Sequence, residues 1–168
     1  MNSLSNSANF KSLTTRQLHV WQAQQLDLAN PVYNIACAVQ FTGGLTSEAL
    51  QQALVLLFAR HPVLSSRIDE TQGEPQLELL PSAPKLLAVP DELAAFSDSI
   101  TAKTLIEQAI DITKETFQFY AGSSETRLLL TIKGHHINCD QWALQVLMSD
   151  LLACVESVLD NSELDLAP

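Results

Sequence analysis

The chain has 168 residues, of which 46% are apolar and 17% are charged, and this composition predicts one packed domain rather than a disordered chain. Its formal net charge of −10 repels phosphate backbones, and no cluster of Lys and Arg offsets that charge, so we expect no nucleic-acid partner. No segment reaches the roughly 20 apolar residues that span a bilayer, and residues 1–12 do not resemble a secretion signal, so we expect a cytoplasmic protein without membrane contacts.

In the first 41 residues, a capping-box pair and an Asn-Pro pair predict where the first helix begins and ends. Residues 1–12 are rich in Asn and Ser and predict a flexible N-terminal arm. Thr14 and Gln17 have the spacing of a capping box, which predicts a helix over about 15–27. The following Asn30-Pro31 ends that helix, and the run Tyr33–Phe41 is typical of a buried strand.

The middle of the chain contains the clearest helix. Apolar residues recur every three or four positions over Ser47–Arg60, which predicts one buried helical stripe. After His61-Pro62, the segments Leu64–Asp69 and Gln76–Leu80 predict two short strands joined by a turn. The stretch Pro81–Pro90 predicts a surface connection with room for a short strand.

The last third again alternates strands and helices. We expect a helix over Ile100–Lys114, strands over Phe117–Tyr120 and Arg127–Lys133, and a helix over Gln141–Asp160. The acidic, proline-ended tail Asn161–Pro168 is typical of a connector. The interleaved pattern predicts an α/β fold, with helices packed on a mixed β-sheet.

A cluster of chemically active side chains follows the last predicted strand. His135 and His136 are adjacent, so a strand would direct them to opposite faces and they cannot perform the same task. Asp140 stands at the start of the next helix, where a carboxylate caps free amides. One histidine is expected to face a cleft, while the other packs or supports.

The residues alone leave several interpretations of this cluster. A metal site built from His135, His136, Cys139 and Asp140 is disfavoured because adjacent histidines diverge, so we expect no metal. Cys139 as a thiol nucleophile lacks an orienting partner, and the three cysteines form no CxxC pair. Two hydrogen-bonded structural histidines and a general acid or base at pKa about 6.5 both remain open.

Three ordered motifs resemble the condensation domains of nonribosomal peptide synthetases, which share the chloramphenicol acetyltransferase fold. The segment HHINCD, residues 135–140, is similar to the family's HHxxxDG signature. The segment LTTRQLHVWQAQQL, followed by YNIA, resembles its opening motif, and RHPVLSSRI resembles its RHxxLR motif. The resemblance runs from Leu13 to about Leu159 and implies a chloramphenicol acetyltransferase-like single lobe.

The resemblance also implies roles for individual residues. His136 matches the histidine that acts on the acceptor amine, and His135 matches the supporting histidine. Asp140 matches the motif aspartate, which is expected to pair with Arg60 in an architectural ion pair. Gln141 replaces the motif glycine and Ser65 replaces the second arginine of RHxxLR, and Gln141 places activity in doubt.

The matching region corresponds to the N-terminal lobe of a two-lobed domain. We therefore divide the chain into an arm (1–12), a lobe (13–160) and the start of an inter-lobe linker (161–168). The parent reaction forms an amide between a carrier-bound acyl or peptidyl thioester and an aminoacyl acceptor. The lobe alone is expected to be weakly active or inactive, because half of the substrate tunnel is missing. Whether it is an enzyme is left open.

The expected partners follow from that reaction. They are peptidyl or acyl carrier proteins with phosphopantetheine arms, and either a C-terminal lobe or a second copy of the chain on an exposed apolar face. No cofactor is expected to bind directly. Two alternatives are a non-catalytic carrier-docking scaffold and a self-oligomerising acyltransferase that uses CoA or carrier thioesters. Trp21 and Trp142 are expected to anchor the core.

Overall fold

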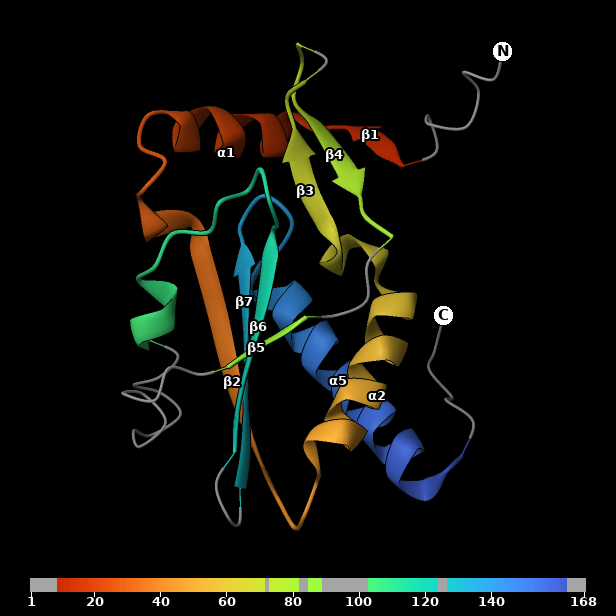
Figure 1. Cartoon of the computed structure of the whole chain (residues 1–168). Coiled ribbons are helices and arrows are strands. Elements are labelled where there is room, and N and C mark those ends of the chain that lie inside the picture. The colour runs from red at the N-terminus through yellow and green to blue at the C-terminus, as the bar shows by residue number, and fades with distance from the viewer. Residues whose placement is uncertain (1–8, 72, 82–84, 89–102, 124–126, 163–168) are drawn as a thin grey trace, which may run out of the picture.

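The computed structural model describes residues 9–71, 73–81, 85–88, 103–123 and 127–162 and contains two sheets and three long helices in these ranges (Figure 1). The helices are α1 (Thr15–Gln25), α2 (Ser47–Arg60) and α5 (Gln141–Asp160), and the short 3-10 turns are η1 (Pro31–Tyr33) and η2 (Pro62–Leu64). The strands are β1 (Phe10–Ser12), β2 (Asn34–Thr42), β3 (Ser66–Asp69), β4 (Gln76–Leu79), β5 (Leu86–Ala88), β6 (Phe117–Ser123) and β7 (Arg127–His135).

The larger sheet has the order β2-β7-β6-β5 and is mixed, as predicted. The pairs β2–β7 and β7–β6 are antiparallel, and β5 pairs with β6 in parallel. Helices α2 and α5 lie side by side on one face of this sheet (Figure 1). The apolar stripes of both helices pack against the even-numbered residues of β7, which are Leu128, Leu130 and Ile132. This packing forms the main core.

A second, smaller core lies beneath α1. The sheet β1-β4-β3 is antiparallel, and Ile68 and Leu77 from it pack with Ile137, which follows the two histidines. Trp21 of α1 packs against this cluster and donates from Nε1 to Glu70 Oε1 at 2.8 Å. The loop that carries the predicted site is therefore anchored in the smaller core, while the strand before it belongs to the main core.

The strongest sequence signals are confirmed at the residue level. The helices α2 and α5 have the predicted bounds, and the capping box of α1 forms between Thr14 and Gln17. The predicted buried strand is β2, shifted by one residue at each end. Helix α5 is long and apolar enough to cross a membrane by length and composition, but Leu144, Leu147 and Leu151 are buried in the main core, so it is not a clear membrane span.

Three expectations about individual segments are wrong. Residues 10–12 of the expected arm form β1, because their backbone pairs with β4, whereas residues 1–8 lie outside the described ranges. β6 continues through Ser123, whereas the predicted strand ended at Tyr120. Within the predicted helix over 100–114, residues 103–106 are helical and 107–114 are not, while 100–102 lie outside the described ranges.

The end of that short helix has a physical cause. Asn34 Nδ2 donates to the carbonyls of Ile106 (2.8 Å) and Gln108 (2.7 Å), and the buried Lys133 Nζ also donates to the Gln108 carbonyl. These carbonyls would otherwise accept bonds from amides further along the helix. Ile110 and Ile112 then pack in the smaller core from an irregular segment.

Gly134 provides a test of the packing just before the two histidines. A Cβ at this position would lie 2.9 Å from Phe117 Cε1 and 3.1 Å from Cys139 Cβ. We expect Gly134→Ala to lower the free energy of unfolding by about 1–3 kcal/mol through overpacking, as measured by urea denaturation. Replacing Phe117 by Leu in the same chain should make the two changes less than additive. Additive losses would contradict the proposed clash.

Candidate active site

His135 is the last residue of β7 and its imidazole is buried, with 1% of the residue exposed. Its Nδ1 accepts from the Ile137 N–H at 3.2 Å, so the ring proton is on Nε2, which donates to Gln24 Oε1 at 3.1 Å. Gln24 is oriented by its own amide nitrogen, which donates to the carbonyls of Asp27 and Asn30. Burial, together with the charge of His136, lowers the pKa of His135 to about 4. His135 is therefore neutral near pH 7 and holds the turn that follows it.

His136 is turned away from this buried arrangement. Its backbone N–H donates to the Tyr33 carbonyl at 2.7 Å, while the neighbours on both sides, His135 and Ile137, are buried. Within the described ranges the His136 imidazole has no hydrogen-bond partner, and it is half-buried. The adjacent histidines thus have different environments, although not by strand alternation, because β7 ends at His135 and His136 lies in the turn that follows.

The His136 ring lines a hollow of about 280 Å³. The first turn of α1, with Arg16 and Gln17, forms one wall. Other lining residues include Asn138 and Asp140 of the loop, and Val63. An imidazole with free ring nitrogens at an open hollow can accept a proton from a bound group or orient it.

Asp140 caps α5 instead of pairing with Arg60, so the expected ion pair is wrong. Its Oδ1 accepts from the Ala143 N–H at 2.8 Å. Arg60 Nε is 2.9 Å from Asp150 Oδ2, which His61 Nε2 also approaches at 2.7 Å. Asp150 is ten residues beyond Asp140, or about 15 Å along a helix, and it is the carboxylate that faces the end of α2.

The carboxylate of Asp150 links the two helices behind the sheet. Burial opposes its ionisation, but the bonds from His61 and Arg60 together keep the pKa of Asp150 below its ordinary value. Arg60 therefore stabilises the packing of α2 on α5 and does not lie at the His136 hollow.

Gln141 and Trp142 begin α5 and are both exposed. Gln141, at the position of the family's glycine, does not line the hollow. Trp142 is 74% exposed, so the expectation that it anchors the core is wrong, whereas Trp21 does pack inside. An amphipathic helix places its second residue on the outer face when its third and fourth face the core.

Cys139 also lines the hollow but is a poor nucleophile. Burial, with the charges of Asp140 and Cys37, raises the pKa of its thiol to about 12. The thiolate required for nucleophilic attack is therefore scarce near neutral pH. Among the described residues, no group of three or more His, Cys, Asp or Glu side chains is arranged to hold a metal ion.

Two contributors to the site were missed by the sequence analysis. Gln24 fixes the tautomer of His135, and the carboxamide of Asn138 bonds to three separate segments of the chain. A polar Asn inside a short apolar turn was an available signal for the second residue. Nothing local in the sequence marks Gln24, because its partner is 111 positions away.

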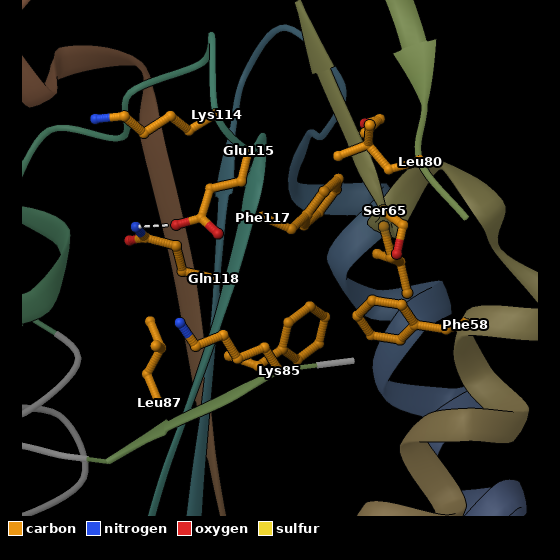
Figure 2. Close-up of a pocket in the computed structure, with 12 residues that line it drawn as sticks. Phe58, Ser65, Leu80, Lys85, Leu87, Lys114, Glu115, Phe117 and Gln118 are labelled. Atoms are coloured by element: carbon orange, nitrogen blue, oxygen red, sulfur yellow. Dashed lines mark hydrogen bonds between the residues drawn. The ribbon is translucent and has the colours of Figure 1, made fainter. Parts of the chain in front are cut away.

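Figure 2 shows a different hollow, of about 250 Å³, beside β6 and α2. Phe58 and Phe117 line it, and Gln118 on the β6 side is hydrogen-bonded to Glu115. It contains none of the site residues predicted from the sequence. A further hollow of about 460 Å³ beside Gln24 and Ala109 also contains none of them. The hollow at His136 is therefore the candidate active site.

Comparisons with known proteins show the family of the chain. The family model described as the condensation domain matches residues 7–168. Phosphinothricin tripeptide synthetase PhsC of Streptomyces viridochromogenes is 27% identical over 165 residues, which are 93% of this chain and 15% of that protein. A dimodular nonribosomal peptide synthase of Bacillus subtilis is 32% identical over 146 residues, which are 83% of this chain and 6% of that protein.

Solved structures show the same fold. The starter condensation domain of rhizomide synthetase RzmA matches with a TM-score of 0.80 at 16% identity, over 95% of this chain and 40% of that one. The first condensation domain of the CDA synthetase matches with a TM-score of 0.77 at 20% identity, over 96% of this chain and 44% of that one. The chain thus spans less than half of each of these solved chains.

The buried, neutral His135 predicts a specific loss of stability in acid. In the unfolded chain His135 has a pKa near 6.5 and binds a proton below that pH. In the folded chain it binds a proton only when the pH approaches 4. The stabilisation is complete above pH 6.5 and is lost as the pH falls toward 4, so between pH 7.5 and 5 we expect it to decrease by about 2 kcal/mol. Urea unfolding of His135→Gln should lack this part of the decrease.

His19→Gln is the matched control, because His19 is exposed on α1 and its replacement should leave the decrease in place. Equal acid sensitivity in the wild-type chain and in His135→Gln would show that His135 is not buried as a neutral ring.

The partner of Arg60 can be tested by double-mutant cycles. We expect Arg60→Ala and Asp150→Ala to show a coupling of about 1 kcal/mol in urea unfolding, because their side chains are in contact and partly exposed. Arg60→Ala and Asp140→Ala should be additive, with Asp140→Ala costing about 1 kcal/mol as a lost helix cap. Coupling of Arg60 to Asp140 in place of Asp150 would overturn the assignment.

Proposed function

Because the chain belongs to the condensation-domain family, we propose that it is the N-terminal lobe of a nonribosomal peptide synthetase condensation domain. The parent reaction joins a carrier-bound acyl or peptidyl thioester to the amine of a carrier-bound aminoacyl acceptor. The observation that carries the proposal is the unpartnered His136 imidazole at the hollow, at the family's HHxxxD position. A histidine so placed is suited to act directly on an amine.

The proposed chemistry gives each nearby residue a role. The acceptor amine attacks the thioester carbonyl carbon, the C–S bond breaks, and the amine proton passes to the departing thiolate. His136 accepts or orients that proton as the C–N bond forms. His135 supports the loop as a neutral ring, and Asp140 fixes the start of α5 as a helix cap. Arg60 acts at a distance, through the packing of α2 on α5.

The proposed lobe is incomplete without a second one. Its match to 40–44% of two solved condensation-domain chains supports a division into a lobe over 13–160 and a connecting segment over 161–168. Exposed apolar side chains in two segments close to the His136 turn along the chain or through a backbone bond also support it. Val32 is 65% exposed and precedes Tyr33, which binds the His136 backbone, and Trp142 is 74% exposed at the start of α5. Such residues are suited to an interface with a second lobe.

The proposed partners are carrier proteins whose phosphopantetheine arms bring both substrates, and the lobe itself is proposed to bind no resident cofactor. One related structure, of the RzmA starter domain, is a complex with C8-CoA, which supports thioester substrates in this family. The second candidate function is a carrier-docking scaffold without turnover. It is favoured by the exposed Gln141 in place of the motif glycine and by the chain's span of less than half of each of the two solved condensation-domain chains.

Reconstitution tests the proposed function. The chain is combined with acyl-loaded and aminoacyl-loaded carriers, with and without a separately supplied C-terminal condensation lobe. We expect amide product only with the second lobe, and a loss of about 100-fold or more in its rate for His136→Ala, because proton transfer contributes about 10² to 10⁴ in rate. Mass spectrometry of the carriers measures the product.

His19→Ala controls for the general effect of removing a histidine, since His19 is exposed and outside the hollow. Carrier binding without product in every combination would favour the scaffold. Product from the chain alone, together with a trimer in solution, would favour the self-oligomerising acyltransferase.

A further inference from the structure

The carboxamide of Asn138 connects three segments that are distant in the sequence. Its Oδ1 accepts from Gln17 Nε2 of α1 at 2.9 Å. Its Nδ2 donates to Ser66 Oγ at the start of β3 and to Thr116 Oγ1 just before β6, both at 3.1 Å. The loop that carries His136 is therefore tied at one side chain to both sheets and to α1.

The sheet side of this connection is rigid. The Ser66 hydroxyl donates to the Val63 carbonyl at 2.5 Å, and the Thr116 hydroxyl lies 2.7 Å from Ser66 Oγ. The Thr116 backbone donates to the Ser66 carbonyl and accepts from the His135 N–H, each at 2.9 Å. Asn138 thus bonds to groups that also hold the end of β7, where the histidines begin.

On the α1 side, the connection to Asn138 is made by Gln17, whose carboxamide forms two sets of hydrogen bonds. Its Oε1 accepts from the Thr14 N–H and the Thr14 hydroxyl, both at 3.0 Å, and this closes the capping box. Its Nε2 is left to donate to Asn138. Since the first turn of α1 forms a wall of the hollow, this single bond joins the wall to the loop two residues after His136.

We propose that the Gln17–Asn138 bridge is a positioning device that sets the placement of the His136 imidazole relative to the α1 wall, and with it the site of the acceptor amine. This inference rests on the function proposed above. Neither residue is a catalytic residue, since the ring that meets the substrate is that of His136.

Loss of the Gln17–Asn138 bridge would leave polar groups without a hydrogen-bond partner. An apolar side chain at 138 would leave the half-buried Gln17 amide and the buried Ser66 and Thr116 hydroxyls without this partner, so the loop or α1 must move to admit water. A misplacement of about 1 Å at a catalytic group costs about 100-fold in rate. Substrate binding on remote surfaces would be unaffected.

The kinetic test uses Asn138→Leu, Gln17→Met and the double variant in the two-lobe reconstitution. We expect kcat to fall about 10- to 100-fold in each single variant with little change in KM for the acceptor carrier, and the double variant to lose no more than the worse single variant. Gln118→Met is the matched control. It removes a carboxamide that bonds Glu115 and Tyr120 away from the His136 hollow, and kcat should be unchanged.

A second measurement needs no turnover. Hydrogen exchange of the chain alone should rise in residues 13–19 and 134–140 in Asn138→Leu and stay at the wild-type rate there in Gln118→Met. If wild-type protein makes no amide, the proposed function fails and exchange alone decides on the bridge. If Asn138→Leu retains wild-type kcat, or if exchange is unchanged in both segments, the bridge does not position His136 and the proposal is overturned.

Discussion

The buried, neutral imidazole of His135 is the constraint on which the candidate site depends. At the end of β7 the chain must leave the sheet, and its next amides need partners. The Nδ1 of His135 supplies one to Ile137, and the His135 carbonyl accepts from the amides of Asn138 and Cys139. This compact turn buries His135 and Ile137 on either side of His136. The turn held by the buried His135 therefore positions the half-buried His136.

The turn also connects the two cores. Gly134, just before His135, allows Phe117 of the main core to approach closely, while Ile137 enters the smaller core beneath α1. Asn138 then bonds to both sheets and to α1. A displacement of α1 relative to the larger sheet would therefore change the position of His136. A histidine placed at such a junction is held by contacts from several distant segments of the chain as well as by its own neighbours in the sequence.

Sequence reasoning succeeded where the signal is local and failed where the partner is distant. The stripe of α2 and the capping box of α1 are readable within a few residues, and both were predicted. The segment 107–114 was predicted to be helical and is not, because Asn34 bonds the carbonyls of Ile106 and Gln108 from 72 and 74 positions away. The predicted partner of Arg60, Asp140, was wrong because only the packing of α5 against α2 places Asp150 at Arg60, while Asp140 caps the start of α5.

The two adjacent histidines have opposite environments: His136 lies at an open hollow that a reactant can enter, and the ring of His135 is buried. Carbethoxylation by diethylpyrocarbonate, mapped residue by residue by mass spectrometry at pH 7, measures this directly. We expect His136 to be modified at a rate near that of exposed His19, His135 to be protected at least tenfold until the chain unfolds, and a second lobe to slow the modification of His136. Modification of His135 as fast as that of His136 in the folded chain would show that the two histidines do not have opposite environments.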